Sequence, residues 1–198
     1  MCRLIETIRL EDGKFGNLSY HQQRMDTAFA NLYLGSTKIN LERVLSKDAY
    51  PARGLFKCRV TYNSSSHGIE YEPYTIRPVV SLKRVEQNEI IYDFKYEDRH
   101  SLNRAFNMKG SCDDILIIKD NLVTDTSYAN IVFKRKNGEW VTPSSYLLRG
   151  TMRQFLIDSG RIKEEPIFEN DIAEFSSCKL INSMLRWDGA EIDVSNIV

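Results

Sequence analysis

The chain has 198 residues, in which 27 Lys plus Arg are balanced by 27 Asp plus Glu, and 42% of the residues are hydrophobic. This length can bury a substantial core in one large domain or two small ones. The balanced charge gives no overall field that would favour nucleic acid or a membrane as partner. No apolar run approaches the roughly 20 residues that a membrane-spanning helix needs.

The cysteines are far apart, at positions 2, 58, 112 and 178, and the three histidines are equally scattered. This spacing forms no C-x-x-C pair, so it favours reduced thiols in a cytoplasmic protein and predicts no metal centre. Residues 1–13 contain acidic residues early and no small-residue cleavage site. We therefore expect no secretory signal.

Residues 1–78 are expected to form a small N-terminal α/β domain. Met25, Ala28 and Phe29 recur at helical spacing after Ser19, a candidate N-cap. The expected helices are 20–34 and 39–45, and the expected strands are 4–10, 54–62 and 69–77, with a hairpin turn at 11–14 and its partner at 15–18. Pro73 and Pro78 mark the end of this domain, and residues 79–92 are expected to be a linker and the first strand of the next domain.

Residues 93–198 are expected to form a larger domain, which makes the whole chain an α/β protein of the α+β type. The expected helices are 98–109, 151–159 (ended by Gly160) and a helical turn within 167–175, and further strands are expected at 139–142 and 179–185. Between these lies the stretch 113–133, DDILIIKDNLVTDTSYANIVF. It reads as a strand at 115–118, a turn at 119–121, and a second strand segment from Val123 to Phe133 that is interrupted by the polar residues 124–130. Such an interruption is typical of either a site wall or an ordinary connection.

Several residue types in the chain could together bind a cofactor with an aldehyde, a ring nitrogen and a phosphate. Lys95 offers an amine for a Schiff base, and Asp125 offers a carboxylate for a positive charge. Hydroxyl and backbone N–H groups of Ser127, Tyr128 and Thr151 could line an anion site, with Thr151 at a helix N-terminus. Taken singly, a lysine is most often a surface residue, a threonine at a helix start is normally a cap, and Asp125 could be a turn residue.

The order of four motifs resembles the fold-type IV pyridoxal phosphate enzymes, also called the class IV aminotransferase family. The matching segments are Ile5–Arg9 with His21-Gln-Gln-Arg24, then Lys95, then Val123–Phe133 (VTDTSYANIVF, similar to V-T-E-x-S-x-x-N-I-F), and finally Leu147–Arg153 (LLRGTMR, similar to L-L-x-G-[IV]-[TM]-R). The resemblance implies the family's fold: a small N-terminal domain, a linker, and a larger domain with a barrel-like sheet. It also implies a cytoplasmic homodimer that binds pyridoxal 5′-phosphate.

The resemblance further implies a role for each matched residue. Lys95 would be the Schiff-base and catalytic lysine, and Asp125 would pair with the ring nitrogen. The residues that would bind the cofactor, mainly its phosphate, are Arg24, Ser127, Tyr128, Thr151 and Met152, although the side chains of Tyr128 and Met152 could serve only for packing.

This sequence departs from the family pattern in three places. Asp125 replaces the usual Glu, the segment before Ile5 is shorter by about two dozen residues, and the segment between the first helix and the linker is abbreviated. The short length and the Tyr96–Arg99 run resemble members grouped with 4-amino-4-deoxychorismate lyase, which releases pyruvate and 4-aminobenzoate for folate biosynthesis. A class IV amino-acid aminotransferase of branched-chain or D-amino-acid type, or a cofactor-binding protein with degenerate catalysis, remain alternatives.

Overall fold

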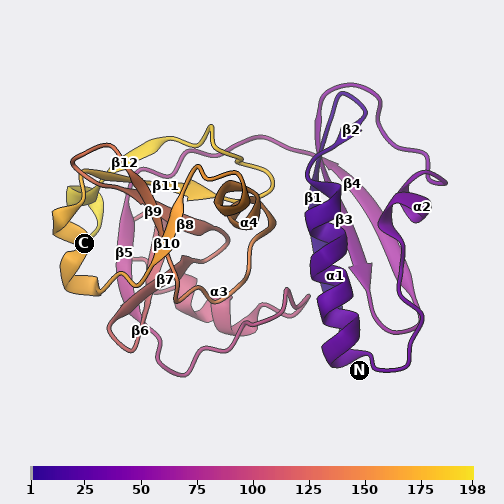
Figure 1. The fold of residues 1–198 in the computed structure, drawn as a ribbon, viewed down its shortest axis with the longest axis horizontal. Coiled ribbons are helices and arrows are strands. Elements are labelled where there is room, and N and C mark those ends of the chain that lie inside the picture. The colour runs from indigo at the N-terminus through magenta and orange to yellow at the C-terminus, as the bar shows by residue number, and fades with distance from the viewer. Residues whose placement is uncertain (1) are drawn as a thin grey trace. The chain divides into compact units, whose positions relative to one another are not determined.

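The structure is a computed structural model that describes residues 2–198, and it divides into two compact units. The first contains residues up to Ile76 together with Phe94–Asp98, and the second contains Arg77–Asp93 and Arg99–Val198. Each has its own sheet, which confirms the expected mixed α/β fold (Figure 1). No helix among residues 2–198 combines the length and apolarity needed to cross a membrane.

The first unit is a four-stranded antiparallel sheet with one long helix against it (Figure 1). The sheet order is β2-β1-β3-β4, with β1 at Leu4–Glu11, β2 at Lys14–Phe15, β3 at Leu55–Tyr62 and β4 at His67–Pro73. Helix α1 (Leu18–Leu32) packs Met25 and Phe29 against Ile8 and Val60 of the sheet, and α2 (Leu41–Leu45) adds two buried leucines. Burial of these side chains supplies the main stabilisation of the unit.

The helix start and one strand end differ from the expectations. Helix α1 begins after Asn17, in a left-handed conformation with φ of 49°, so the predicted Ser19 cap is wrong. Asn tolerates this conformation better than most residues. The strand expected at 69–77 ends at Pro73, because Pro has no N–H to continue a ladder.

The second unit contains the larger sheet, in the order β10-β9-β8-β7-β6-β5, with β11 paired to both β8 and β12. The strands are β5 Leu82–Glu86, β6 Asp114–Lys119, β7 Leu122–Thr126, β8 Asn130–Lys134, β9 Trp140–Pro143, β10 Lys163–Glu165, β11 Ser177–Ile181 and β12 Glu191–Asp193. The helices are α3 His100–Phe106, α4 Thr151–Asp158 and the 3-10 turns η1 Glu169–Glu174 and η2 Val194–Asn196. The pairs β5–β6 and β9–β10 are parallel.

The interrupted strand expected at 123–133 is wrong, because the chain reverses direction there. Strands β7 and β8 are antiparallel neighbours, with Asp125 opposite Asn130. The turn between them is closed by Thr126, whose N–H donates to the carbonyl of Ala129 at 2.9 Å and whose hydroxyl accepts from the Ala129 N–H. The hairpin thus places Asp125 and Asn130 side by side at the start of a tight turn.

The expected strand 179–185 also ends early, at Ile181. The next residue, Asn182, accepts hydrogen bonds from the N–H groups of Met184 and Leu185 through its side-chain oxygen. Asn commonly forms turns in this way. This turn lies near the β7–β8 turn, because the Asn182 amide approaches the Tyr128 carbonyl at 3.5 Å.

Candidate cofactor-binding residues

In the first unit, a buried carboxylate joins strand β1 to helix α1. Glu6 accepts from His21 Nδ1 at 2.5 Å and from Arg24 Nε at 2.9 Å, with a second bond from the Arg24 NH2 group. His21 and Arg24 are three residues apart on α1, so they share the helix face that meets β1. Glu6 and His21 are fully buried, whereas 15% of the Arg24 side chain is exposed.

The charges of this cluster follow from its contacts. Burial alone would raise the pKa of Glu6, but Arg24 and His21 outweigh it and hold this pKa at about 2. Burial lowers the pKa of His21, against the opposing effect of Glu6, so the imidazole is neutral at neutral pH. The cluster is therefore an anion–cation pair with a neutral histidine, and Glu6 fixes the Arg24 guanidinium by a bidentate bond.

Lys95 belongs to this first unit. Its carbonyl accepts from the Ile5 N–H at 2.9 Å, and its neighbour Tyr96 forms a bridge with Leu4. The Lys95 charge is near enough to contribute to the lowered pKa of His21. The structure thus brings two of the expected site residues, Arg24 and Lys95, into one region of one unit.

In the second unit, Asp125 is buried and held by three donors. Its Oδ2 atom accepts from the N–H groups of Leu147 and Leu148 at 3.0 and 2.9 Å, and its Oδ1 atom accepts from Asn130 Nδ2 at 2.7 Å. Burial raises the pKa of Asp125 to about 6, although these hydrogen bonds act in the opposite direction. A carboxylate in this environment is stabilised further by a nearby cation.

Gly150, the residue before α4, leaves no room for a side chain unless Asn130 moves. Its φ of −70° is ordinary, but a Cβ atom there would lie 1.8 Å from Asn130 Oδ1. Gly150 has no side chain that could cap the helix. The backbone N–H groups of the first turn, at Thr151 and Met152, therefore receive no hydrogen bond from a cap side chain, and the positive end of the helix dipole lies there. Thr151 and Met152 are themselves buried.

The β7–β8 turn is held by a cation from outside the hairpin. Arg99 donates from NH2 to the carbonyl of Ser127 at 2.6 Å, and Ser127 also bonds to the buried Asp114. Ser127 is buried, whereas Tyr128 is 36% exposed. Both expected residues therefore lie on one turn whose backbone is fixed by neighbouring side chains.

The sequence patterns gave no role to several residues that organise these sites. They are Glu6, His21, Arg99, Asn130, Arg153 and Asn182. A signal existed for Glu6, since an acidic residue in the apolar run Leu4–Ile8 requires a buried partner. Arg153 ends the matched motif LLRGTMR, but no role was expected for it. Only 1% of its side chain is exposed, and its guanidinium stacks on the Tyr146 ring at 4.3 Å and pairs with Glu164 at 3.2 Å.

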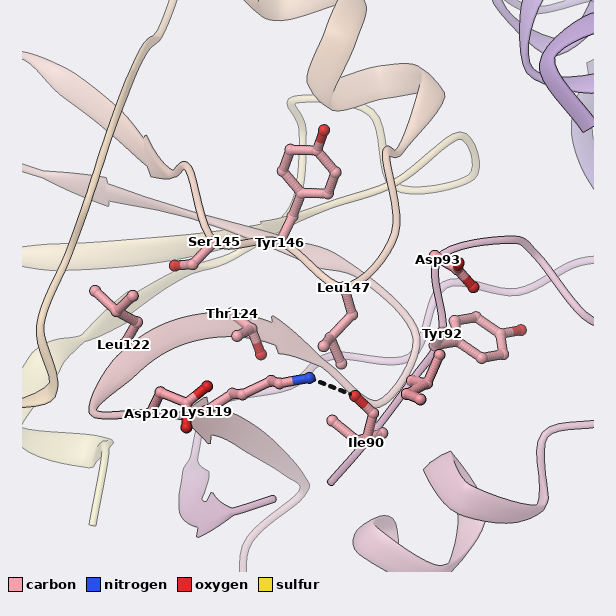
Figure 2. A pocket seen from close by; sticks show the side chains of 11 residues that line it. Ile90, Tyr92, Asp93, Lys119, Asp120, Leu122, Thr124, Ser145, Tyr146 and Leu147 are labelled. Atoms are coloured by element: carbon pink, nitrogen blue, oxygen red, sulfur yellow. Dashed lines mark hydrogen bonds between the residues drawn. The ribbon is translucent and has the colours of Figure 1, made fainter. Parts of the chain in front are cut away.

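A separate cavity of about 350 Å³ lies in the second unit, beside Thr124 and Leu147 (Figure 2). Lys119 reaches across it and donates from Nζ to the carbonyl of Ile90 at 2.8 Å. Thr124 and Asp125 are adjacent in β7, so their side chains point to opposite faces of the sheet. None of the expected site residues lines this cavity.

Comparisons with known proteins place this chain in a family. The family model for class IV amino-transferases matches residues 93–189. A crystal structure of a "putative 4-amino-4-deoxychorismate lyase" from Haemophilus somnus is 33% identical, with a TM-score of 0.88, over 96% of this chain and 98% of that one. An uncharacterized protein of Haemophilus influenzae is 36% identical over 187 residues, which are 93% of this chain and 98% of the relative.

The chain therefore belongs to the class IV aminotransferase family and is an enzyme of that family. The fold is also shared with a hypothetical aminotransferase from Mycobacterium tuberculosis in its PLP-bound form. That structure is 17% identical, with a TM-score of 0.78, and the alignment covers 96% of this chain and 80% of that one.

Proposed function

We propose that this protein is a pyridoxal phosphate-dependent lyase that converts 4-amino-4-deoxychorismate into 4-aminobenzoate and pyruvate, a reaction of folate biosynthesis. The supporting observation is the similarity to the Haemophilus somnus protein, which extends over almost the full length of both chains. The match covers 96% of this chain and 98% of a protein that carries the lyase name.

The residues present fit pyridoxal 5′-phosphate. The cofactor requires an amine for covalent attachment, an acceptor for its protonated ring nitrogen and donors for its phosphate. The chain supplies Lys95 as the amine and the buried carboxylate of Asp125 as the acceptor. The donors are the Arg24 guanidinium, fixed by Glu6, and the N-terminus of α4 at Thr151.

Each of these groups has a separate task in the proposed reaction. The bound cofactor would supply the electron sink, into which the substrate's electrons move when a proton leaves the carbon that carries the amino group. Lys95 would hold the cofactor covalently and then accept that proton. Asp125 would keep the ring nitrogen protonated, because an adjacent carboxylate favours the cationic form of the ring. The phosphate of the cofactor would be bound by the remaining expected residues, which are Arg24, Ser127, Tyr128, Thr151 and Met152.

The reaction is tested by supplying the cofactor-loaded protein with 4-amino-4-deoxychorismate. We expect pyruvate and 4-aminobenzoate in equal amounts. Pyruvate is measured with a coupled lactate dehydrogenase assay, and 4-aminobenzoate is measured by chromatography. Lys95→Ala should produce neither, and Lys109→Ala serves as the matched lysine control that should retain both. Release of keto acids from amino acids, without 4-aminobenzoate from the chorismate substrate, would identify an aminotransferase instead.

We also propose that the protein is a cytoplasmic homodimer that acts on a small-molecule amino substrate. All four cysteines are unpaired thiols, which suits a reducing compartment, and the dimer is the usual assembly of the family. Light scattering coupled to gel filtration should give about twice the 23.0 kDa mass of one chain. A monomeric mass at micromolar concentration would contradict the dimer.

A further inference from the structure

The hydrogen bonds around Asp125 leave one defined acceptor position. A carboxylate has about four lone-pair sites. Two sites on Oδ2 are used by the N–H groups of Leu147 and Leu148, and one on Oδ1 is used by Asn130. The remaining site is on Oδ1, so this carboxylate can accept one further N–H donor.

The amide of Asn130 determines which site remains. Its Nδ2 group donates to Asp125 Oδ1 at 2.7 Å and to the carbonyl of Leu148 at 2.9 Å. Both neighbours of Nδ2 are acceptors, so the amide cannot turn over without bringing oxygen against oxygen. Asn130 Oδ1 packs against Gly150, where a Cβ atom would lie 1.8 Å away. The amide is therefore locked on both sides.

We infer that Asn130 is a positioning residue that orients the Asp125 carboxylate so that a single lone pair of Oδ1 receives the N–H of the cofactor's protonated ring nitrogen. The inference rests on the proposed function, because it assumes that pyridoxal phosphate binds. It assigns to Asn130 a role that acts only through Asp125, and it makes the hairpin pair of Asp125 and Asn130 a functional unit.

The same geometry explains why Asp serves here in place of the family's Glu. The two backbone N–H groups at Leu147 and Leu148 lie within 3.0 Å of the shorter side chain. A longer side chain would carry its carboxylate beyond them. Asp125→Glu should therefore weaken the ring-nitrogen contact in this protein, although Glu is the usual residue of the family.

The experiment compares pyridoxal phosphate with its 1-deaza analogue, in which carbon replaces the ring nitrogen. Equilibrium dissociation constants for both are measured by fluorescence for the wild type, Asn130→Ala, Asn130→Ser, Gly150→Ala and Asp125→Glu. Thr142→Val is the matched control, because Thr142 is a fully buried residue whose hydroxyl donates to the Ile131 carbonyl at 2.8 Å and not to Asp125. Tryptophan fluorescence verifies that each variant is folded.

The wild type should prefer pyridoxal phosphate to the analogue by about tenfold or more, which is typical of one hydrogen bond to a charged group. In Asn130→Ala and Asn130→Ser this preference should fall towards onefold, because a buried carboxylate with one donor fewer takes up a proton and cannot accept from the ring. Thr142→Val should keep the wild-type preference.

The outcomes separate the two proposals. A wild type that binds neither compound overturns the proposed function, and this inference with it. If the wild type prefers pyridoxal phosphate to the analogue and the Asn130 variants show the same preference, the role of Asn130 is overturned and the proposed function stands. If the Asn130 variants do not fold, Gly150→Ala decides, because its new methyl group displaces the Asn130 amide: a weaker preference than wild type supports the positioning role, and an equal or stronger preference overturns it.

Discussion

Replacing Glu6 by Gln should remove a pH-dependent contribution to the stability of the first unit. The pKa of this carboxyl lies at about 2, below its ordinary value of 4.5, since Arg24 and His21 outweigh the effect of burial. A tenfold change in proton affinity corresponds to about 1.4 kcal/mol. The ionised carboxylate therefore contributes about 3 kcal/mol to the free energy of unfolding at neutral pH.

The pH dependence of this contribution follows from the direction in which the pKa of Glu6 is shifted. The folded-state pKa is lower than the unfolded-state value, so the contribution is fully present above pH 4.5 and is lost as the pH falls from 4.5 through about 2. Glu6→Gln should thus be less stable than wild type by about 3 kcal/mol at pH 7, and the difference should shrink steadily in acid.

The assay must report on the first unit, and the two tryptophans, Trp140 and Trp187, both lie in the second. Hydrogen exchange of peptides from β1 and α1, followed by mass spectrometry, reads the opening free energy of the first unit directly. Glu11→Gln is the matched control. Glu11 also forms a bidentate pair with an arginine of β1, Arg9, but its side chain is 41% exposed, so its loss should cost less than about 1 kcal/mol. A Glu6→Gln penalty that is equal at pH 7 and pH 3 would refute the reasoning.

The remaining predictions concern the second unit. Without cofactor, its stability should rise as the pH falls from above 6 to below 3.8, by about 3 kcal/mol in all and by about 1.4 kcal/mol between pH 7.5 and pH 5, because the folded-state pKa of Asp125 is raised to about 6 from 3.8. Asp125→Asn should remove this dependence. Urea titrations monitored by tryptophan fluorescence measure the free energy of unfolding at pH 5 and pH 7.5, and a wild-type value that is the same at both pH values would contradict the prediction. Gly150→Ala should destabilise the unit by about 1–3 kcal/mol, because the new methyl group meets Asn130, and pairing it with Asn130→Ala should recover part of the loss; a double variant as unstable as the sum of the two single variants would contradict this. Arg153→Met should lower the midpoint of thermal unfolding, since the buried guanidinium bonds to a backbone carbonyl at 2.8 Å, and an unchanged midpoint would show that its contacts contribute no net stability.

Local periodicity was enough to predict most strands and helices, including α1, α4 and strands β1, β3 and β6. It failed at residues 127–129, because a polar interruption of a strand and a tight hairpin turn use the same short polar residues. Only the pairing of Asp125 with Asn130 distinguishes them. The hairpin, and with it the contact between these two side chains, could not be read from spacing.

Local sequence patterns also could not predict that Lys95 packs with the N-terminal unit. Residues 95–97 pair with the start of the chain, through the Lys95 carbonyl and through the Glu97 N–H, which donates to the Arg3 carbonyl at 2.9 Å. Such long-range pairing leaves no periodic signal in the sequence. The domain limits expected at 78 and 92 stay predictions. By contrast, the motif order was sufficient to identify the family, because it depends on residue types and not on pairing.

Covalent attachment of the cofactor to Lys95 is the step on which the proposed reaction depends most. Borohydride reduction of the protein after incubation with pyridoxal phosphate, followed by peptide mass spectrometry, locates the modified lysine. We predict a single phosphopyridoxyl group on the peptide that contains Lys95 and the loss of near-visible absorbance in Lys95→Ala. Modification of Lys109 or another lysine instead, or a band that persists in Lys95→Ala, would contradict the account.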